Sequence, residues 1–288
     1  MLDKDKICAA IIVKDETDYL KEWLDYHLGI GFDKIFLAIN DDEGLSKYPY
    51  LKDYEDYLVI YNLAGCEAMQ KPFYNCIINN EDYKWCAFID TDEFISCRKD
   101  SGFTNIKDFL NNAPAEVEAY KLNWELYGDD GQVYYEDRPV LERFTKPLPP
   151  ICNTYKFEEQ CHTKTILRKI DTKPGQIKFI ANPHVVVGCN YYLTNGEPTD
   201  ASPFNFDTEK SVVYIKHFYT KTIEEWVKHK LGRSYADYER SENIDYYPIS
   251  TFFKYNECTP EKLKFLKEHG IEYPKQSKDK QQCRYFCL

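Results

Sequence analysis

Asp90 and Asp92 are the residues of this chain whose type and spacing most clearly suggest chemistry. They follow a short apolar run, residues 85–89, which is typical of a buried strand. Because they are two residues apart, their side chains share one side of the chain if it remains extended, and two crowded carboxylates are costly without a cation. Mg²⁺ or Mn²⁺ held by such carboxylates keeps positions for phosphate oxygens. The pair therefore predicts a metal–diphosphate site in a nucleotide-sugar enzyme, and the alternative is an ordinary acidic loop.

Further acids lie at the ends of two other expected strands. Asp15 and Glu16 follow the apolar run of residues 7–13, and Asp41 follows residues 34–39. Ligands of open α/β sheets bind outside the carboxyl ends of the strands. Carboxylates there could accept hydrogen bonds from a nucleobase or from ribose hydroxyls. The alternative is that Asp15 caps a helix and that Asp41 belongs to a turn.

His217 is a third candidate, at the exit of an expected strand over residues 212–219. A neutral imidazole is a common metal ligand, so we expect His217 to complete the metal site. His184 has the same ambiguity between a ligand and a hydrogen-bonded packing residue. A basic stretch that includes Lys221 follows His217 and could meet a diphosphate. The alternative for that stretch is a solvated helix face.

An alternation of strands and helices must position these residues. Apolar runs and helical spacing predict strands over 7–13, 34–39 and 85–89, and helices over 17–28 and 67–79. This order predicts an α/β fold with a mostly parallel sheet flanked by helices. After about residue 115 the pattern becomes mixed, and helices return over 223–231 and 260–269. We expect one domain over residues 1–288, with a nucleotide-binding half to about 115 and a mixed α+β acceptor side from about 116.

Composition and charge exclude several classes of protein. The chain has 288 residues and a formal net charge of −11, which leaves no basic face for a nucleic acid. Its 11 cysteines are scattered without a Cys-x-x-Cys pair, which favours reduced thiols in the cytoplasm over a zinc site. The first residues lack the pattern of a secretory signal, and no apolar run approaches the ~20 residues that span a bilayer. We expect a cytoplasmic protein, either soluble or peripheral at the inner face of the membrane.

Four blocks of the sequence resemble a known group of enzymes. The blocks are IIVKDETDYLKEWLDYHLGIGFDKIFL, WCAFIDTDEF, NWELYGDDG with the later RPVLERF, and IKHFYTKTIEEW. In this order they are similar to the family-2-like and family-92-like glycosyltransferases of GT-A fold, from about residue 7 to 233. The resemblance implies a Rossmann-like nucleotide-binding half, a UDP-linked sugar donor and a Mn²⁺ or Mg²⁺ ion.

The resemblance also implies roles for individual residues. Asp90 and Asp92 occupy the DxD position, and Glu16 and Asp41 fall where such enzymes contact the nucleotide. His217 falls at the position of a late metal-binding histidine. Relatives place a catalytic carboxylate on the acceptor side, after the DxD motif. Four acids compete for that role in an inverting transfer to a glycan or a lipid-linked saccharide: Asp129, Asp130, Glu136 and Asp137.

Two other classes of protein remain as alternatives. A sugar nucleotidyltransferase would also need a divalent ion and acids at strand ends. It usually carries a glycine-rich loop after the first strand, and residues 13–16 contain no glycine. A non-catalytic glycan-binding protein could retain the fold, but acids at all three strand ends argue against such a loss of activity.

Overall fold

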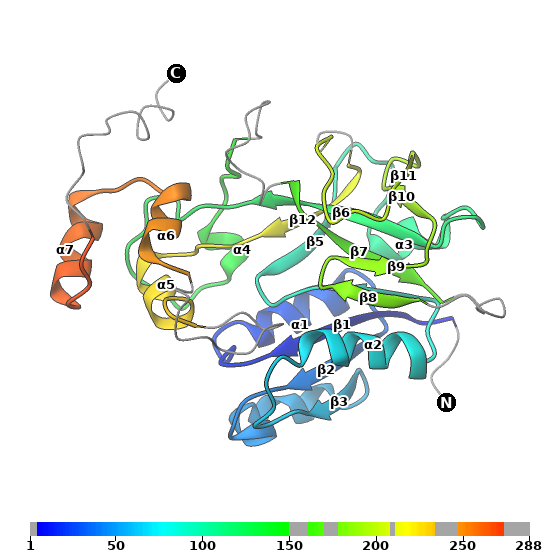
Figure 1. Ribbon diagram of the computed structural model, residues 1–288, viewed down its shortest axis with the longest axis horizontal. Coiled ribbons are helices and arrows are strands. Elements are labelled where there is room, and N and C mark those ends of the chain that lie inside the picture. The colour runs from blue at the N-terminus through cyan, green and yellow to red at the C-terminus, as the bar shows by residue number, and fades with distance from the viewer. Residues whose placement is uncertain (1–4, 150–160, 170–177, 208–210, 234–246, 274–288) are drawn as a thin grey trace.

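The computed structural model describes residues 5–149, 161–169, 178–207, 211–233 and 247–273. Its centre is a ten-stranded sheet in the order β11-β10-β6-β7-β4-β1-β2-β3, to which β12 and β5 add beside β6. Strands β8 and β9 form a separate pair. Figure 1 shows helices on both sides of the sheet, with α5, α6 and α7 gathered at one end.

The first part of the chain builds the parallel part of the sheet. Its elements are β1 (Ile7–Val13), α1 (Leu20–Gly29), β2 (Lys34–Ile39), β3 (Leu58–Asn62), α2 (Gln70–Asn80) and β4 (Trp85–Phe88), with the 3₁₀ turns η1 (Gly44–Lys47) and η2 (Pro49–Tyr54). Strand β1 lies between β2 and β4, and these pairs and the β2–β3 pair are parallel. The α/β prediction is therefore confirmed, although β3 was not predicted.

The second part of the chain combines helices and strands, as predicted, and its antiparallel strands make the sheet mixed. Its strands are β5 (Glu93–Cys97), β6 (Ala119–Leu126), β7 (Thr163–Arg168), β8 (Phe179–Asn182), β9 (Val185–Val187), β10 (Tyr191–Leu193), β11 (Pro198–Thr199) and β12 (Val213–His217). Its helices are α3 (Ile106–Asn111), α4 (Val140–Arg143), α5 (Ile223–His229), α6 (Ile249–Tyr255) and α7 (Pro260–Glu268). Strand β7 is antiparallel to both β4 and β6, while β12 is parallel to β6 and antiparallel to β5.

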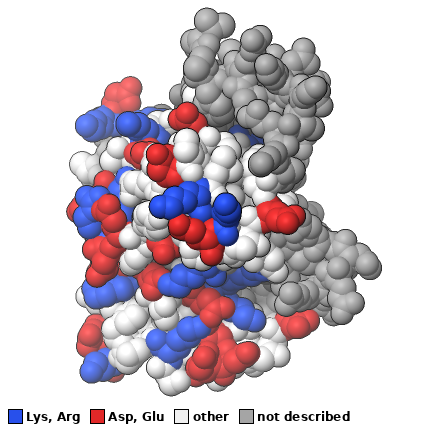
Figure 2. All heavy atoms as spheres, turned by 90° about the vertical axis from the view of Figure 1, so that its left-hand side faces the viewer, with Lys and Arg blue, Asp and Glu red and all other residues white. Residues whose placement is uncertain are grey.

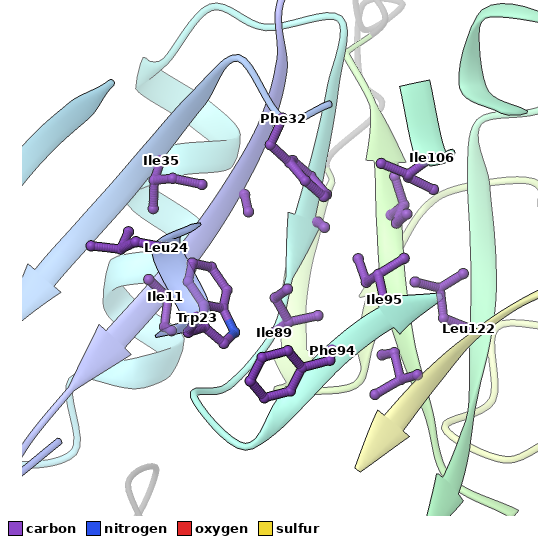
Figure 3. Packing of buried hydrophobic residues seen from close by; sticks show 14 of the residues in the cluster. Ile11, Trp23, Leu24, Phe32, Ile35, Ile89, Phe94, Ile95, Ile106 and Leu122 are labelled. Carbon is purple, nitrogen blue, oxygen red and sulfur yellow. The ribbon is translucent and has the colours of Figure 1, made fainter. Parts of the chain in front are cut away.

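The two faces of β1 explain why its sequence is an unbroken apolar run. Successive side chains of a strand point to opposite faces. Ile11 packs in one buried cluster with Trp23 of α1, while Ala10 packs in a second cluster with Phe73 of α2. Because both faces of the strand are covered by helices, no polar residue alternates with the apolar ones. Figure 3 shows Trp23 and Ile11 within the first cluster.

The chain does not stay extended through Asp90 and Asp92, so the expectation that their side chains share one side is corrected. The Glu93 amide donates to the Asp90 carbonyl at 3.1 Å, which closes a turn, and β5 begins at Glu93. The Trp23 indole nitrogen donates to the carbonyls of both Asp90 and Glu93 at 3.0 Å. In Figure 3 this nitrogen points toward the segment between Ile89 and Phe94. Trp23 of helix α1 therefore fixes the shape of the turn over residues 90–93.

Candidate active site

A cavity of about 750 Å³ lies at the carboxyl ends of β1 and β4. This volume is within the range of small-molecule sites, roughly 300–1,000 Å³. Both parts of the chain line it, from Val13 at the end of β1 to His217 at the end of β12. The cavity is where ligands of open α/β sheets are expected. The candidate residues from the sequence that line it include Asp15, Glu16, Asp90, Asp92, His184 and His217.

Asp90 is held by two side chains of the cavity wall. Gln70 Nε2 donates to one carboxylate oxygen at 2.9 Å, and Lys164 Nζ lies 2.6 Å from the other. Lys164 is almost fully buried on β7. Burial alone would lower the pKa of Lys164, but Asp90 and Glu93 outweigh it and raise the pKa. This ammonium therefore stays charged and neutralises the first acid of the pair.

Asp92 faces a different pair of partners. Lys230 Nζ lies 2.8 Å from one of its carboxylate oxygens, and His217 Nε2 lies 3.4 Å from the other. Burial alone would raise the pKa of Asp92, but Lys230 and His217 outweigh it and lower the pKa well below its usual range. Asp92 is therefore an anion at neutral pH, and its partners differ from those of Asp90.

The β5–β12 pairing brings His217 to Asp92. His217 lies opposite Glu93 in the antiparallel register, and the Phe218 amide donates to the Asp92 carbonyl at 2.8 Å. The ring packs against Trp124, with 4.2 Å between ring centroids, and among the described residues its Nδ1 has no hydrogen-bond partner. Burial lowers the pKa of His217 despite the nearby Asp92. The imidazole is therefore neutral and has the form of a metal ligand.

The described residues supply only part of the ligand set that a divalent ion needs. Among the described residues, no group of three or more His, Cys, Asp and Glu side chains is arranged to hold a metal. Two ligands that bind one ion at about 2 Å each lie roughly 3 Å apart, and the 3.4 Å between Asp92 Oδ1 and His217 Nε2 fits that spacing. Phosphate oxygens and water commonly complete such an open site. Asp92 and His217 are thus spaced as two ligands of one ion would be, and the predicted role of Asp90 as a further ligand stays a prediction.

Asp15 and Glu16 line the cavity, whereas Asp41 supports the loop that carries Asp15. The buried Asp41 accepts hydrogen bonds from the Asp15 amide at 2.8 Å and from the Tyr48 hydroxyl at 2.6 Å. It is not among the cavity-lining residues, and it fixes the loop that carries Asp15. Asp15 does not cap α1, because Tyr19 occupies that position. Glu16 lies 3.5 Å from Arg233 Nη1.

Lys221 is not among the residues that line the cavity, but Lys230 and Arg233 of the same basic stretch are. The Lys221 ammonium lies over the Tyr19 ring, 3.8 Å from its centroid. Lys14 and Lys164 also line the cavity and were not singled out from the sequence. In the sequence, Lys164 is a single lysine between two threonines of a strand. Such a pattern is typical of a strand face exposed to solvent, so it gave no indication that Lys164 is buried beside Asp90.

The structure does not bring the four acceptor-side acids to the cavity. Asp129 forms an ion pair with the buried Lys262, and Asp130 accepts hydrogen bonds from the backbone and hydroxyl of Thr145. Glu136 pairs with Arg138 at the surface at 2.7 Å, and Asp137 is exposed. None of the four is among the described residues that line the cavity. The sequence placed them by their order after Asp92, which does not determine where a loop folds.

The charges around this end of the molecule are mixed. Figure 2 views the side on which α5, α6 and α7 lie in Figure 1, and there Lys and Arg alternate with Asp and Glu. No large area of one sign stands out on this face. Among the described residues, no helix has the length and apolar character to cross a membrane.

Comparison with known proteins identifies the family. The sequence model described as Glycosyltransferase family 92 matches residues 6–249. This chain belongs to glycosyltransferase family 92. Every described residue that lines the cavity falls within the matched range. The family-92 resemblance inferred from the four sequence blocks is therefore confirmed.

Relatives in family 92 are distant and longer than this chain. A family 92 protein of rice, Oryza sativa subsp. japonica, is 24% identical over 190 residues, which cover 64% of this chain and 30% of the rice protein. A family 92 protein of Ricinus communis is 21% identical over 236 residues, which cover 81% of this chain and 38% of that protein. The chain thus spans only about a third of the length of these relatives.

Solved structures of one protein also show a partial likeness to this chain. Residues 1–349 of S. aureus TarS match with a TM-score of 0.35 and 13% identity, covering 57% of this chain and 47% of TarS. The same TarS segment has been solved in complex with UDP-GlcNAc, and that structure matches with a TM-score of 0.35 and 14% identity, covering 57% of this chain and 45% of TarS.

Proposed function

We propose that this chain transfers a sugar from a UDP-linked donor to a saccharide acceptor, with the help of Mn²⁺ or Mg²⁺ and with inversion at the anomeric carbon. The observation that carries the proposal is the cavity at the carboxyl ends of β1 and β4, where Asp92 and His217 meet beside Lys230. Membership of glycosyltransferase family 92 supports the reaction class. The acceptor class, a glycan or a lipid-linked saccharide, is part of the same proposal.

The nucleotide is proposed to lie against Asp15 and Glu16, at the end of β1. Their carboxylates can accept hydrogen bonds from ribose hydroxyls or from a base N–H. Burial raises the pKa of Glu16, although Lys221 and Arg233 oppose it. A ligand that donates a hydrogen bond to this buried carboxylate would take the place of water as its partner. Asp41 contributes indirectly by fixing the loop that bears Asp15.

The diphosphate is proposed to lie between Lys230 and Asp92. A metal ion held by Asp92 and His217 would supply positive charge to the leaving diphosphate. Without a metal ion, Lys230 pairs with Asp92 at 2.8 Å. When a metal ion binds Asp92, the Lys230 ammonium would be free to pair with a phosphate oxygen instead. Arg233 lines the same wall and adds a second fixed positive charge. The remaining catalysis comes from holding donor and acceptor in line.

Calorimetry with UDP, GDP, CDP and TDP, each with and without Mn²⁺, tests the proposal. We expect UDP to bind most tightly, and only with the metal present. A clear preference for GDP would overturn the nucleotide assignment. Binding of a free sugar without any nucleotide would favour a non-catalytic glycan-binding protein. Formation of UDP-sugar from UTP and a sugar phosphate would favour a nucleotidyltransferase.

A His217→Ala variant should need roughly tenfold or more additional Mn²⁺ for half-maximal UDP binding. Loss of a neutral ligand leaves the ion with Asp92 alone, and even losing a residue that supports a metal ligand costs roughly 10–100-fold in affinity. The measurement is UDP calorimetry across a series of Mn²⁺ concentrations. His269→Ala, at the end of α7 and outside the cavity lining, is the matched control. An unchanged metal requirement would assign His217 to packing against Trp124.

A further inference from the structure

The second part of the chain lines the cavity with histidines, where the sequence had suggested carboxylates. All the acids among the described lining residues come from the first part of the chain, before residue 93. The second part contributes His162, His184 and His217 together with Trp124. A base that activates an acceptor must lie across the sugar from the diphosphate. His217 already faces Asp92, so the two other imidazoles remain for this role.

His184 is held in one orientation by three hydrogen bonds. Its ring Nδ1 lies 2.9 Å from the Thr163 carbonyl oxygen. Its backbone amide donates to Asn182 Oδ1 at 2.8 Å, and its carbonyl accepts from the Thr165 hydroxyl at 2.8 Å. The residue therefore belongs to the rigid turn between β8 and β9, which is tied to β7.

The contact with Thr163 determines the tautomer of the ring. A carbonyl oxygen can only accept a hydrogen bond, so the Nδ1 of His184 must carry a proton. In a neutral imidazole the other nitrogen, Nε2, then holds a lone pair. A general base needs such a lone pair. The hydrogen bond that Nδ1 makes to Thr163 therefore leaves Nε2 as the nitrogen that can accept a proton.

The surroundings keep the ring neutral. Burial is the main cause that lowers the pKa of His184 well below its usual value, and Lys164 and His162 add to it. The charged and titratable groups that face the ring are Lys164 of β7, His162 before β7 and His217 of β12. The Trp124 ring lies against it edge-on, with 5.2 Å between ring centroids, and offers an apolar surface for a sugar.

We propose that His184 is the general base of the transfer reaction, a role that rests on the proposed function. Nε2 takes the proton of the acceptor hydroxyl as its oxygen bonds to the anomeric carbon of the donor. The bond between that carbon and the diphosphate oxygen breaks, and its electron pair leaves with the diphosphate. Water in place of the saccharide gives donor hydrolysis by the same proton transfer.

Two variants of His184 test the role in the 288-residue chain. His184→Gln keeps a hydrogen-bond acceptor but cannot take the proton, and His184→Ala removes the ring. The assay is hydrolysis of UDP-glucose, UDP-galactose and UDP-GlcNAc with Mn²⁺, alongside calorimetry with UDP. We expect hydrolysis to fall roughly 10²–10⁴-fold in both variants, with UDP affinity unchanged. Added imidazole should restore part of the rate in His184→Ala only. His269→Gln is the control, with an unchanged rate.

Each outcome decides between the proposals. Full activity in His184→Gln would overturn the base and leave a hydrogen-bonding role. Failure of the wild-type chain to bind UDP would overturn the proposed function itself, and the base with it. If UDP binds but no donor is hydrolysed, ¹⁵N NMR of the His184 ring decides. A neutral ring protonated at Nδ1 supports the base, whereas a proton on Nε2 at neutral pH overturns it.

Discussion

An Asp92→Asn variant should lose at least roughly tenfold, and up to about 100-fold, of its affinity for UDP in the presence of Mn²⁺. The amide keeps the shape of the carboxylate but removes the charge that Asp92 presents to Lys230 and to His217. A divalent ion would then have one neutral ligand from the chain. UDP calorimetry with a fixed Mn²⁺ concentration measures the change.

The control for this variant is Asp42→Asn, which removes an exposed acid after β2. Its UDP affinity should equal that of the unmodified chain. If Asp92→Asn bound UDP as well as Asp42→Asn did, the metal and diphosphate could not lie at the Asp92 end of the cavity. A second signature is expected in the metal-free protein. Burial already lowers the pKa of Lys230 although Asp92 opposes it, so the loss of Asp92 should lower this pKa further.

Glu225→Ala should lower the free energy of unfolding by about 3–5 kcal/mol, the usual cost of removing one partner of a buried ion pair. Glu225 and Arg143 are buried and form two parallel hydrogen bonds at 2.8 and 2.9 Å. Glu225 also accepts hydrogen bonds from the Tyr19 and Thr222 hydroxyls, and it completes the capping box of α5. Urea denaturation, or a melting temperature lower by about 10 °C, measures the loss.

Glu136→Ala is the matched control, because Glu136 pairs with Arg138 in solvent and both side chains are about half exposed. Such surface pairs contribute about 0–1 kcal/mol. If Glu225→Ala lowered the free energy of unfolding no more than Glu136→Ala does, the prediction would be wrong. The attraction between Glu225 and Arg143 would then only offset the cost of burying the two charges. The double variant Arg143→Met with Glu225→Leu should recover much of the loss, since no unpaired charge remains buried.

The same pair gives a pH dependence with a defined direction. Burial alone would raise the pKa of Glu225, but the hydrogen bonds from Arg143 and the charge of Lys221 outweigh it and lower the pKa to about 2. The unfolded value is about 4.3. A group with a depressed folded pKa stabilises the protein above its unfolded pKa, and that contribution is lost as pH falls toward the folded pKa. The stability that Glu225 adds should therefore disappear between about pH 4 and pH 2.

The parallel strands could be predicted from the sequence because they are buried on both faces. Because both faces of β1 and β2 are buried, the sequence of each strand is an almost unbroken apolar run. The bounds predicted for these two strands agree with the structure. β5 could not be found in this way. The chain reverses between Asp90 and Glu93 without a glycine or proline, so no local signal separates β4 from β5. The turn is fixed instead by Trp23, which is distant in sequence.

The candidate site was predictable where it depends on strand ends and not where it depends on loops. Asp92 and His217 each follow a recognisable strand, and the sheet brings both to the same edge. Asp129 and Asp130 follow β6 equally closely, but the chain turns there toward Lys262 and Thr145. The role of His184 depends on the Thr163 carbonyl, a backbone group that leaves no trace in the residue pattern.

The position of β12 between β5 and β6 has a consequence for the order in which the molecule assembles. This strand pairs with two segments made much earlier in the chain, so its contacts are non-local and carry a large entropy of loop closure. We expect it to dock late, after β1, β2 and β4 have formed. A chain still being synthesised therefore lacks a complete cavity until residues well past 217 have emerged, because Lys230 and Arg233 also line it. A ligand that binds the cavity afterwards stabilises only the finished fold.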